Sequence, residues 1–196
     1  KVTGVQTCAL PILPNAKATD YTDAVCSHYP GAENVSWTTM KLEHPPEGKG
    51  KTVEQLGLLR DRLYPGRPVL ITEEGWWGQK DIKPDVAASA VVRVHVPEIA
   101  GGADTVAWFA QLSVDDPSYM LGENDVPWPA YCAYAAMTRS LGGADCVGPV
   151  DLGVESVMSY LFIRGERATL VLWAPEGTPE MTLKLGTNQA IDRKST

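Results

Sequence analysis

Apolar residues recur along the middle of the chain in two alternating patterns. Short continuous apolar runs, which are typical of strands buried on both faces, are followed by longer segments with apolar residues at helical spacing. The continuous runs predict strands at Asp23–Tyr29, Pro68–Thr72 and Asp104–Leu112. The spaced patterns predict helices at Thr52–Leu63, Pro84–Ala100 and Pro129–Leu141.

Capping and stop signals refine the bounds of these helices. Thr52 can cap the first helix, and Pro84 suits the first turn of the second, where a missing N–H costs nothing. Pro97 lies inside the second helix and is expected to kink or end it, because proline removes a backbone donor. The segment Ala32–Lys51 is polar and contains paired prolines, which predicts a long surface loop.

The order of the elements predicts an α/β fold. Strands that alternate with helices form βαβ units, and these build a parallel sheet. In a (β/α)8 barrel the reactive groups stand at the carboxyl ends of such strands. Here those ends carry His28-Tyr29, Glu73-Glu74 and the segment Gln111–Asp116. Polar and aromatic residues therefore gather where a barrel enzyme would need them.

The pattern changes after Asp145, where strands follow one another without an intervening helix. Strands are predicted at Ser156–Arg164, Arg167–Trp173 and Met181–Leu185, with a turn at Gly165-Glu166. Successive strands joined by short turns are typical of antiparallel sheets. This part of the chain is therefore expected to be the start of an antiparallel β-sandwich.

Composition and charge narrow the possible partners. The chain has 196 residues, of which 44% are hydrophobic, as in a globular protein with a buried core. No apolar run approaches the roughly 20 residues that span a bilayer. The net charge of −7 argues against nucleic acid or an anionic membrane as a partner.

Cysteine and histidine positions give no sign of a metal site. Apart from Cys8, the cysteines are Cys26, Cys132 and Cys146, which lack CxxC spacing and are predicted to be buried apolar thiols. The histidines are also not spaced as zinc ligands. We therefore expect neither a metal nor another cofactor.

The run Pro68–Trp77 (PVLITEEGWW) carries the sharpest chemical signal. Glu73 follows residues that should be buried, so its carboxylate is expected at a strand end. A carboxylate there can attack an anomeric carbon if a second carboxyl group, about 5–5.5 Å away, protonates the leaving oxygen. The alternative is that Glu73 and Glu74 are ordinary loop acids. Side-chain alternation would point the two glutamates to opposite sides, and we favour Glu73.

Three segments resemble the last three βα units of clan A glycoside hydrolases, which are retaining (β/α)8 enzymes related to xylosidases and glucanases. Asp23–Pro30 (DAVCSHYP) is similar to the sixth strand. Arg67–Trp76 (RPVLITEEGW) is similar to the seventh, where Thr-Glu-x-Gly places the nucleophile. Thr105–Asp116 with Pro127–Ala144 is similar to the eighth strand and helix. The resemblance implies a partial TIM barrel, strands six to eight, followed by a partial β-sandwich.

The resemblance also implies roles for individual residues. Glu73 is the expected catalytic nucleophile. A pyranose ring presents an apolar face of C–H groups, on which aromatic side chains can stack. The candidate substrate-binding residues are His28, Tyr29, Trp76, Trp77 and Trp108.

Both ends of the chain resemble translated sequencing adapter. The match covers Val2–Ile12 (VTGVQTCALPI) and, as the reverse complement, Asp192–Thr196 (DRKST). We therefore expect a piece of a longer gene. The predicted divisions are adapter-like residues 1–12, the barrel part 13–144, the start of the sandwich 145–191, and adapter-like residues 192–196.

The expected function follows from what the chain carries and lacks. The family's acid/base glutamate follows an asparagine on the fourth strand, and no Asn-Glu pair occurs here. We expect part of a retaining O-glycoside hydrolase that carries the nucleophile, lacks the acid/base and is inactive in isolation. The alternative is a non-catalytic carbohydrate-binding or scaffolding protein built on the same barrel.

The expected partner in either case is a glycoside, an oligosaccharide or a polysaccharide. The sequence leaves open the sugar, the linkage, exo or endo action and the oligomeric state. It also leaves open the compartment, a secreted parent included.

Overall fold

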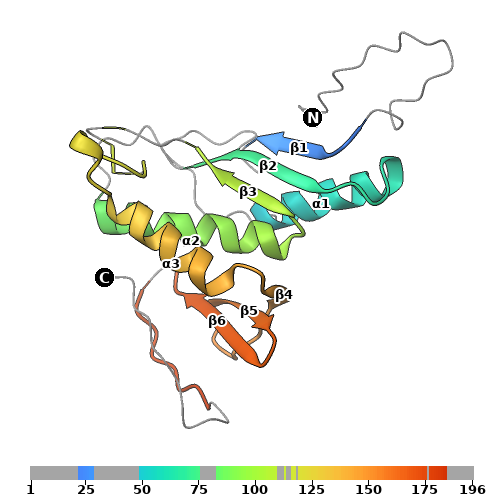
Figure 1. The fold of residues 1–196 in the computed structure, drawn as a ribbon. Helices are drawn as coiled ribbons and strands as arrows, with labels where there is room; N and C mark the ends of the chain where they lie inside the picture. The colour runs from blue at the N-terminus through green and yellow to red at the C-terminus, as the bar shows by residue number, and fades with distance from the viewer. Residues whose placement is uncertain are drawn as a thin grey trace, which may run out of the picture.

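The computed structural model describes residues 22–28, 49–75, 83–109, 113, 116–117, 119–175 and 177–184. In this part of the chain, two three-stranded sheets lie on either side of a layer of helices (Figure 1). The fold is therefore mixed α/β, as the alternation of strands and helices predicted. Residues 32–48 of the predicted surface loop lie outside the described residues.

The first sheet is parallel. It consists of β1 (Val25–His28), β2 (Val69–Glu74) and β3 (Thr105–Trp108), in the order β1-β2-β3. β3 ends at Trp108, so that Phe109 of the predicted strand lies beyond it, and residues 110–112 lie outside the described residues. Because the three strands are parallel, their carboxyl ends meet at one edge of the sheet.

The helices are α1 (Lys49–Leu63), α2 (Pro84–Ala100) and α3 (Pro129–Leu141). The bounds predicted for α2 and α3 are confirmed. α1 begins at Lys49, so Thr52 lies inside the helix and is not its cap. Among the described helices, none has the length and apolar character that a membrane span requires.

Pro97 does not end α2, which continues to Ala100. A proline after the first turn lacks one helical hydrogen bond and crowds the carbonyl group four residues before it, which disfavours the helix without excluding it. Its carbonyl oxygen still accepts a hydrogen bond from the Gly101 amide at 2.8 Å, and Gly102 donates to Ile99 at 3.0 Å. These bonds close the helix end in spite of the proline.

Helices α1 and α2 cover one face of the first sheet, the lower face in Figure 1. Val25, Val69 and Ile71 form a buried cluster with Val53 and Leu56 of α1. These strand residues therefore point to the helix-covered side, which we call the helix face. We call the opposite side the upper face.

The second sheet is antiparallel and consists of β4 (Asp145–Pro149), β5 (Met158–Arg164) and β6 (Arg167–Trp173), in that order. The pattern predicted β5 and β6 but not β4, which contains Gly148 at a positive φ and ends in a proline. The strand predicted at Met181–Leu185 is wrong over residues 181–184, which form no strand. An alternating pattern makes a strand only where a neighbour pairs with it.

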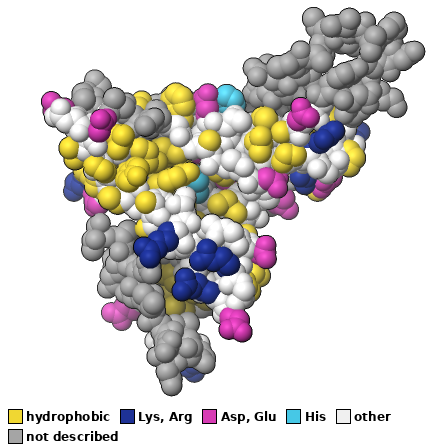
Figure 2. Space-filling model, viewed as in Figure 1, with side chains coloured by type: hydrophobic (Ala, Val, Ile, Leu, Met, Phe, Trp, Pro, Cys, Tyr) yellow, Lys and Arg dark blue, Asp and Glu magenta, His cyan; other side chains and the backbone are white. Residues whose placement is uncertain are grey.

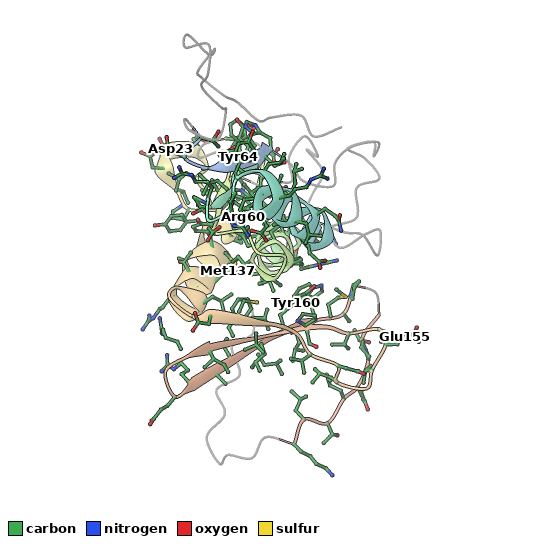
Figure 3. The ribbon with its side chains drawn as sticks, turned by 90° about the vertical axis from the view of Figure 1, so that its right-hand side faces the viewer. Asp23, Arg60, Tyr64, Met137, Glu155 and Tyr160 are labelled. Carbon is green, nitrogen blue, oxygen red and sulfur yellow. The ribbon has the colours of Figure 1, made fainter. Side chains whose placement is uncertain are left out.

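The second sheet packs on the helices. Tyr160 and Phe162 of β5 share a buried cluster with Val91 of α2 and Met137 of α3, and Figure 3 shows Tyr160 at the junction between the helices and this sheet. Trp173 stacks on Tyr160 with ring centroids 5.5 Å apart. Within the described residues, helices therefore pack on one side of the second sheet, and no other sheet covers the opposite side of this sheet.

Phe162→Ala is predicted to loosen the second sheet from the helices, because Phe162 is fully buried between β5 and the two helices. Losing a buried phenyl ring typically costs about 3–5 kcal/mol of unfolding free energy. Urea unfolding, followed by the near-UV circular dichroism of the aromatic residues, measures this loss.

The matched control is Ile163→Ala, which changes an exposed side chain on the same strand. This variant is expected to lose less than about 1 kcal/mol. Similar losses in the two variants would contradict the packing of β5 on the helices.

Candidate active site

β2 contains one extra residue near its carboxyl end. Ser27 of β1 pairs with Ile71, but the next residue, His28, pairs with Glu73, so that Thr72 is passed over. Thr72 is nevertheless held at this point, because its hydroxyl donates to the Ser27 carbonyl oxygen at 3.4 Å. The irregularity is therefore a one-residue β-bulge at Thr72.

The same bulge appears on the β3 side of the strand. Ile71 pairs with Val106, whereas Glu74, three residues further on, pairs with Trp108, only two residues further on. An extra residue reverses the alternation of side chains beyond it. Ile71 lies on the helix face, so the bulge brings Glu73 to the upper face and Glu74 to the helix face.

Glu73 and His28 lie side by side at the carboxyl ends of neighbouring strands. Nδ1 of His28 is 3.4 Å from Oε2 of Glu73, and their side chains are 53% and 34% exposed, respectively. Solvent can therefore reach this carboxylate. At this distance a protonated imidazole would form an ion pair with the carboxylate of Glu73, and a neutral imidazole would restrict the rotation of the Glu73 side chain.

Glu74 has the opposite environment, because it is completely buried. Its Oε1 accepts a hydrogen bond from the Gly75 amide at 3.0 Å, and its carbonyl oxygen accepts one from the Phe109 amide at 2.6 Å. Of the two adjacent glutamates, only Glu73 offers its carboxylate to solvent.

Trp108 packs on the helix face of the sheet. Its ring stacks on that of His95 of α2, with centroids 5.6 Å apart and an angle of 21° between the planes. His95 is itself buried and makes an edge contact with Tyr134 of α3. The structure thus brings His28 and Glu73 together but places Trp108 on the other side of the sheet. Tyr29, Trp76 and Trp77 lie outside the described residues.

Phe109 is an aromatic residue at the strand ends that the sequence pattern did not single out. It follows Trp108 directly, is 45% exposed, and its amide is bonded to Glu74. Val126 and Tyr131, later in the chain, are also exposed, and Figure 2 shows apolar side chains gathered on one side of the molecule. The signal available in the sequence was an aromatic pair at the end of a buried strand.

A small hairpin follows β3 and is held by Trp128. Leu121 and Pro127 form an isolated β-bridge, and Nε1 of Trp128 donates to the Ser113 carbonyl oxygen at 3.1 Å. A Cβ atom on Gly122 would lie 3.0 Å from Nε1 of the indole, so a larger residue here would require the ring to shift. The Trp128 ring therefore holds the hairpin in place.

The described residues contain no group of three or more His, Cys, Asp or Glu side chains that could hold a metal ion. Burial raises the pKa of the Cys26 thiol and of the Cys146 thiol, which keeps both protonated at neutral pH. Cys132 is exposed on α3, so the prediction that it is a buried thiol is wrong. Cys132 lies on the solvent-exposed side of α3, whereas another side of this helix is buried.

Two solved structures resemble this fold. One is a 4-O-α-L-rhamnosyl-β-D-glucuronidase from Fusarium oxysporum, with 16% identity, a TM-score of 0.54, and coverage of 85% of this chain and 37% of that protein. The other is a GH30 endoxylanase from Clostridium papyrosolvens, with 13% identity, a TM-score of 0.49, and coverage of 83% and 36%. No family model matches the sequence, and neither does any curated protein.

The first of these likenesses establishes that the chain has a glycosidase-like fold. The chain spans little more than a third of the length of either protein. The resemblance to glycoside hydrolases that the sequence indicated is confirmed at the level of the fold.

The different exposure of the two glutamates predicts different chemical reactivity. Brief treatment with a water-soluble carbodiimide and an amine should label Glu73 in preference to Glu74, because only Glu73 is accessible. Peptide mass spectrometry locates the label. In urea the preference should disappear, and preferential labelling of Glu74 in the folded chain would contradict the bulge.

Proposed function

We propose that this chain is part of a retaining O-glycoside hydrolase in which Glu73 is the catalytic nucleophile. Residues 13–144 would supply the last three βα units of the barrel, and residues 145–191 the start of a β-sandwich. One observation carries the proposal: a partly exposed carboxylate stands beside His28 at the carboxyl ends of parallel strands in a glycosidase-like fold.

In the proposed reaction Glu73 attacks the anomeric carbon, and the bond from this carbon to the leaving oxygen breaks. A covalent glycosyl ester forms while a second carboxyl group, outside this chain, donates its proton to the leaving oxygen. The same group then takes a proton from water, which attacks the ester and frees Glu73. His28, 3.4 Å from the carboxylate, would keep Glu73 oriented towards the sugar.

Aromatic side chains near the strand ends would hold the sugar. Tyr29, Trp76 and Trp77 are retained as candidates, on the resemblance alone, whereas Trp108, which the resemblance also indicates, packs against α2 on the opposite side of the sheet from Glu73. Phe109 joins them because it is exposed directly after β3 and its amide is bonded to Glu74, the neighbour of Glu73. An oligosaccharide or polysaccharide with exposed pyranose faces is the substrate class that such rings fit.

Glu73→Gln is predicted to abolish turnover in the longer polypeptide that contains this chain, because an amide cannot form the glycosyl ester. The expected loss in kcat is on the order of 10⁴-fold or more. Azide should restore cleavage of an activated aryl glycoside and give a product of inverted configuration, which NMR identifies.

The control is Glu123→Gln, which alters an exposed glutamate in the hairpin after β3 and should leave kcat unchanged. Retained activity of Glu73→Gln would overturn the proposal. A wild-type polypeptide that binds oligosaccharides without cleaving them would instead favour the non-catalytic carbohydrate-binding protein.

A pair of variants separates the two neighbouring aromatic candidates. Phe109→Ala is predicted to raise KM about tenfold or more, the scale of one lost stacking contact, with little change in melting temperature. Trp108→Ala should chiefly lower the melting temperature, because Trp108 packs against α2. Steady-state kinetics and thermal unfolding of both variants provide the test, and a reversed result would make Trp108 the sugar platform.

A further inference from the structure

The bulge in β2 leaves a fully buried carboxylate that the proposed chemistry does not use. The other helix-face positions of this strand, Val69 and Ile71, are aliphatic, whereas the position after the bulge is Glu74. Burying a carboxylate is costly unless its oxygens receive hydrogen bonds. A glutamate where the pattern calls for an aliphatic residue therefore needs a reason.

Two hydrogen bonds to Glu74 fix the end of β2 on two sides. Its carbonyl oxygen accepts from the Phe109 amide, which joins the strand end to β3. Its carboxylate oxygen Oε1 accepts from the Gly75 amide, which fixes the peptide that leaves the strand. Its partner in the sheet, Trp108, is in turn held by the stack on His95 of α2.

These contacts bear directly on Glu73, which lies between the bulge and Glu74. If β2 paired regularly, without the bulge at Thr72, the alternation of side chains from Ile71 onward would place Glu73 on the helix face. The bulge persists only if the residues after Thr72 keep their one-residue register shift relative to β1 and β3. Holding the main chain on both sides of Glu74 keeps them in that register.

We propose that Glu74 is a positioning residue, whose buried carboxylate holds the Gly75 amide and thereby maintains the bulge that presents Glu73 on the upper face. This inference rests on the proposed function, because the group it positions is the proposed nucleophile. Glu74 itself touches no reacting atom. The proposed role depends on an oxygen acceptor at the end of a side chain of this length.

The test replaces Glu74 in the longer polypeptide. Glu74→Met keeps a flexible side chain of similar length, suited to a buried site, but removes the acceptor. We expect kcat to fall about 10- to 100-fold, the scale of a small misplacement of a reacting group, with KM within about twofold of wild type. Hydrogen exchange of the Gly75 amide should become faster at the same time.

Two further variants separate positioning from general stability. Glu74→Gln keeps an acceptor oxygen, and it should recover most of the kcat and the slow exchange at Gly75. Glu98→Met removes another fully buried glutamate, on α2 and away from the strand ends. It should lower the melting temperature as much as Glu74→Met without the loss in kcat.

The outcomes distinguish this inference from the proposed function. If Glu73→Gln retains activity, the proposed function fails, whatever Glu74 does. If Glu73→Gln is inactive while Glu74→Met keeps wild-type kcat, only the positioning role is overturned. A loss in Glu74→Gln as large as that expected for Glu74→Met would also overturn it, and this result decides the question even if Glu74→Met does not fold.

Discussion

The one-residue bulge at Thr72 is the constraint on which the candidate site depends. A regular β2 would carry Glu73 on the same face as Ile71, against the helices, and would send Glu74 to solvent. The extra residue exchanges the two glutamates, so that one carboxylate lies beside His28 and the other is buried. Bulges near active sites commonly redirect a side chain in this way.

The sequence predicted the positions of helices and strands more reliably than the geometry at the ends of the strands. The bounds of α2 and α3 could be predicted because a proline begins each helix and a pair of glycines follows it. Alternation told us that Glu73 and Glu74 face opposite ways, but not which one faces the helices. The face on which each glutamate lies depends on how β2 pairs with β1 and β3, which are distant in sequence. No local pattern near Thr72 predicts the bulge.

The same limit explains the second sheet. Alternating residues in β5 and β6 marked the strands correctly, but they cannot say what covers a strand. The aromatic side chains of Tyr160 and Trp173 belong to the same cluster as residues of α2 and α3, a partner that the alternation along β5 and β6 did not indicate. Binary pattern identifies an apolar face, whereas the partner of that face is a property of the whole fold.

Helix α2 links these two parts of the structure. Its residues Val91 and Val96 join the cluster that includes β5, while Ala90, Val94 and His95 pack against Trp108 beside the end of β2. The strand end that carries Glu73 is thus backed by a helix that is itself buried on both sides. Reactive groups need rigid support to keep their orientation. The second sheet therefore supports the end of β2 through α2, against which this sheet and Trp108 both pack.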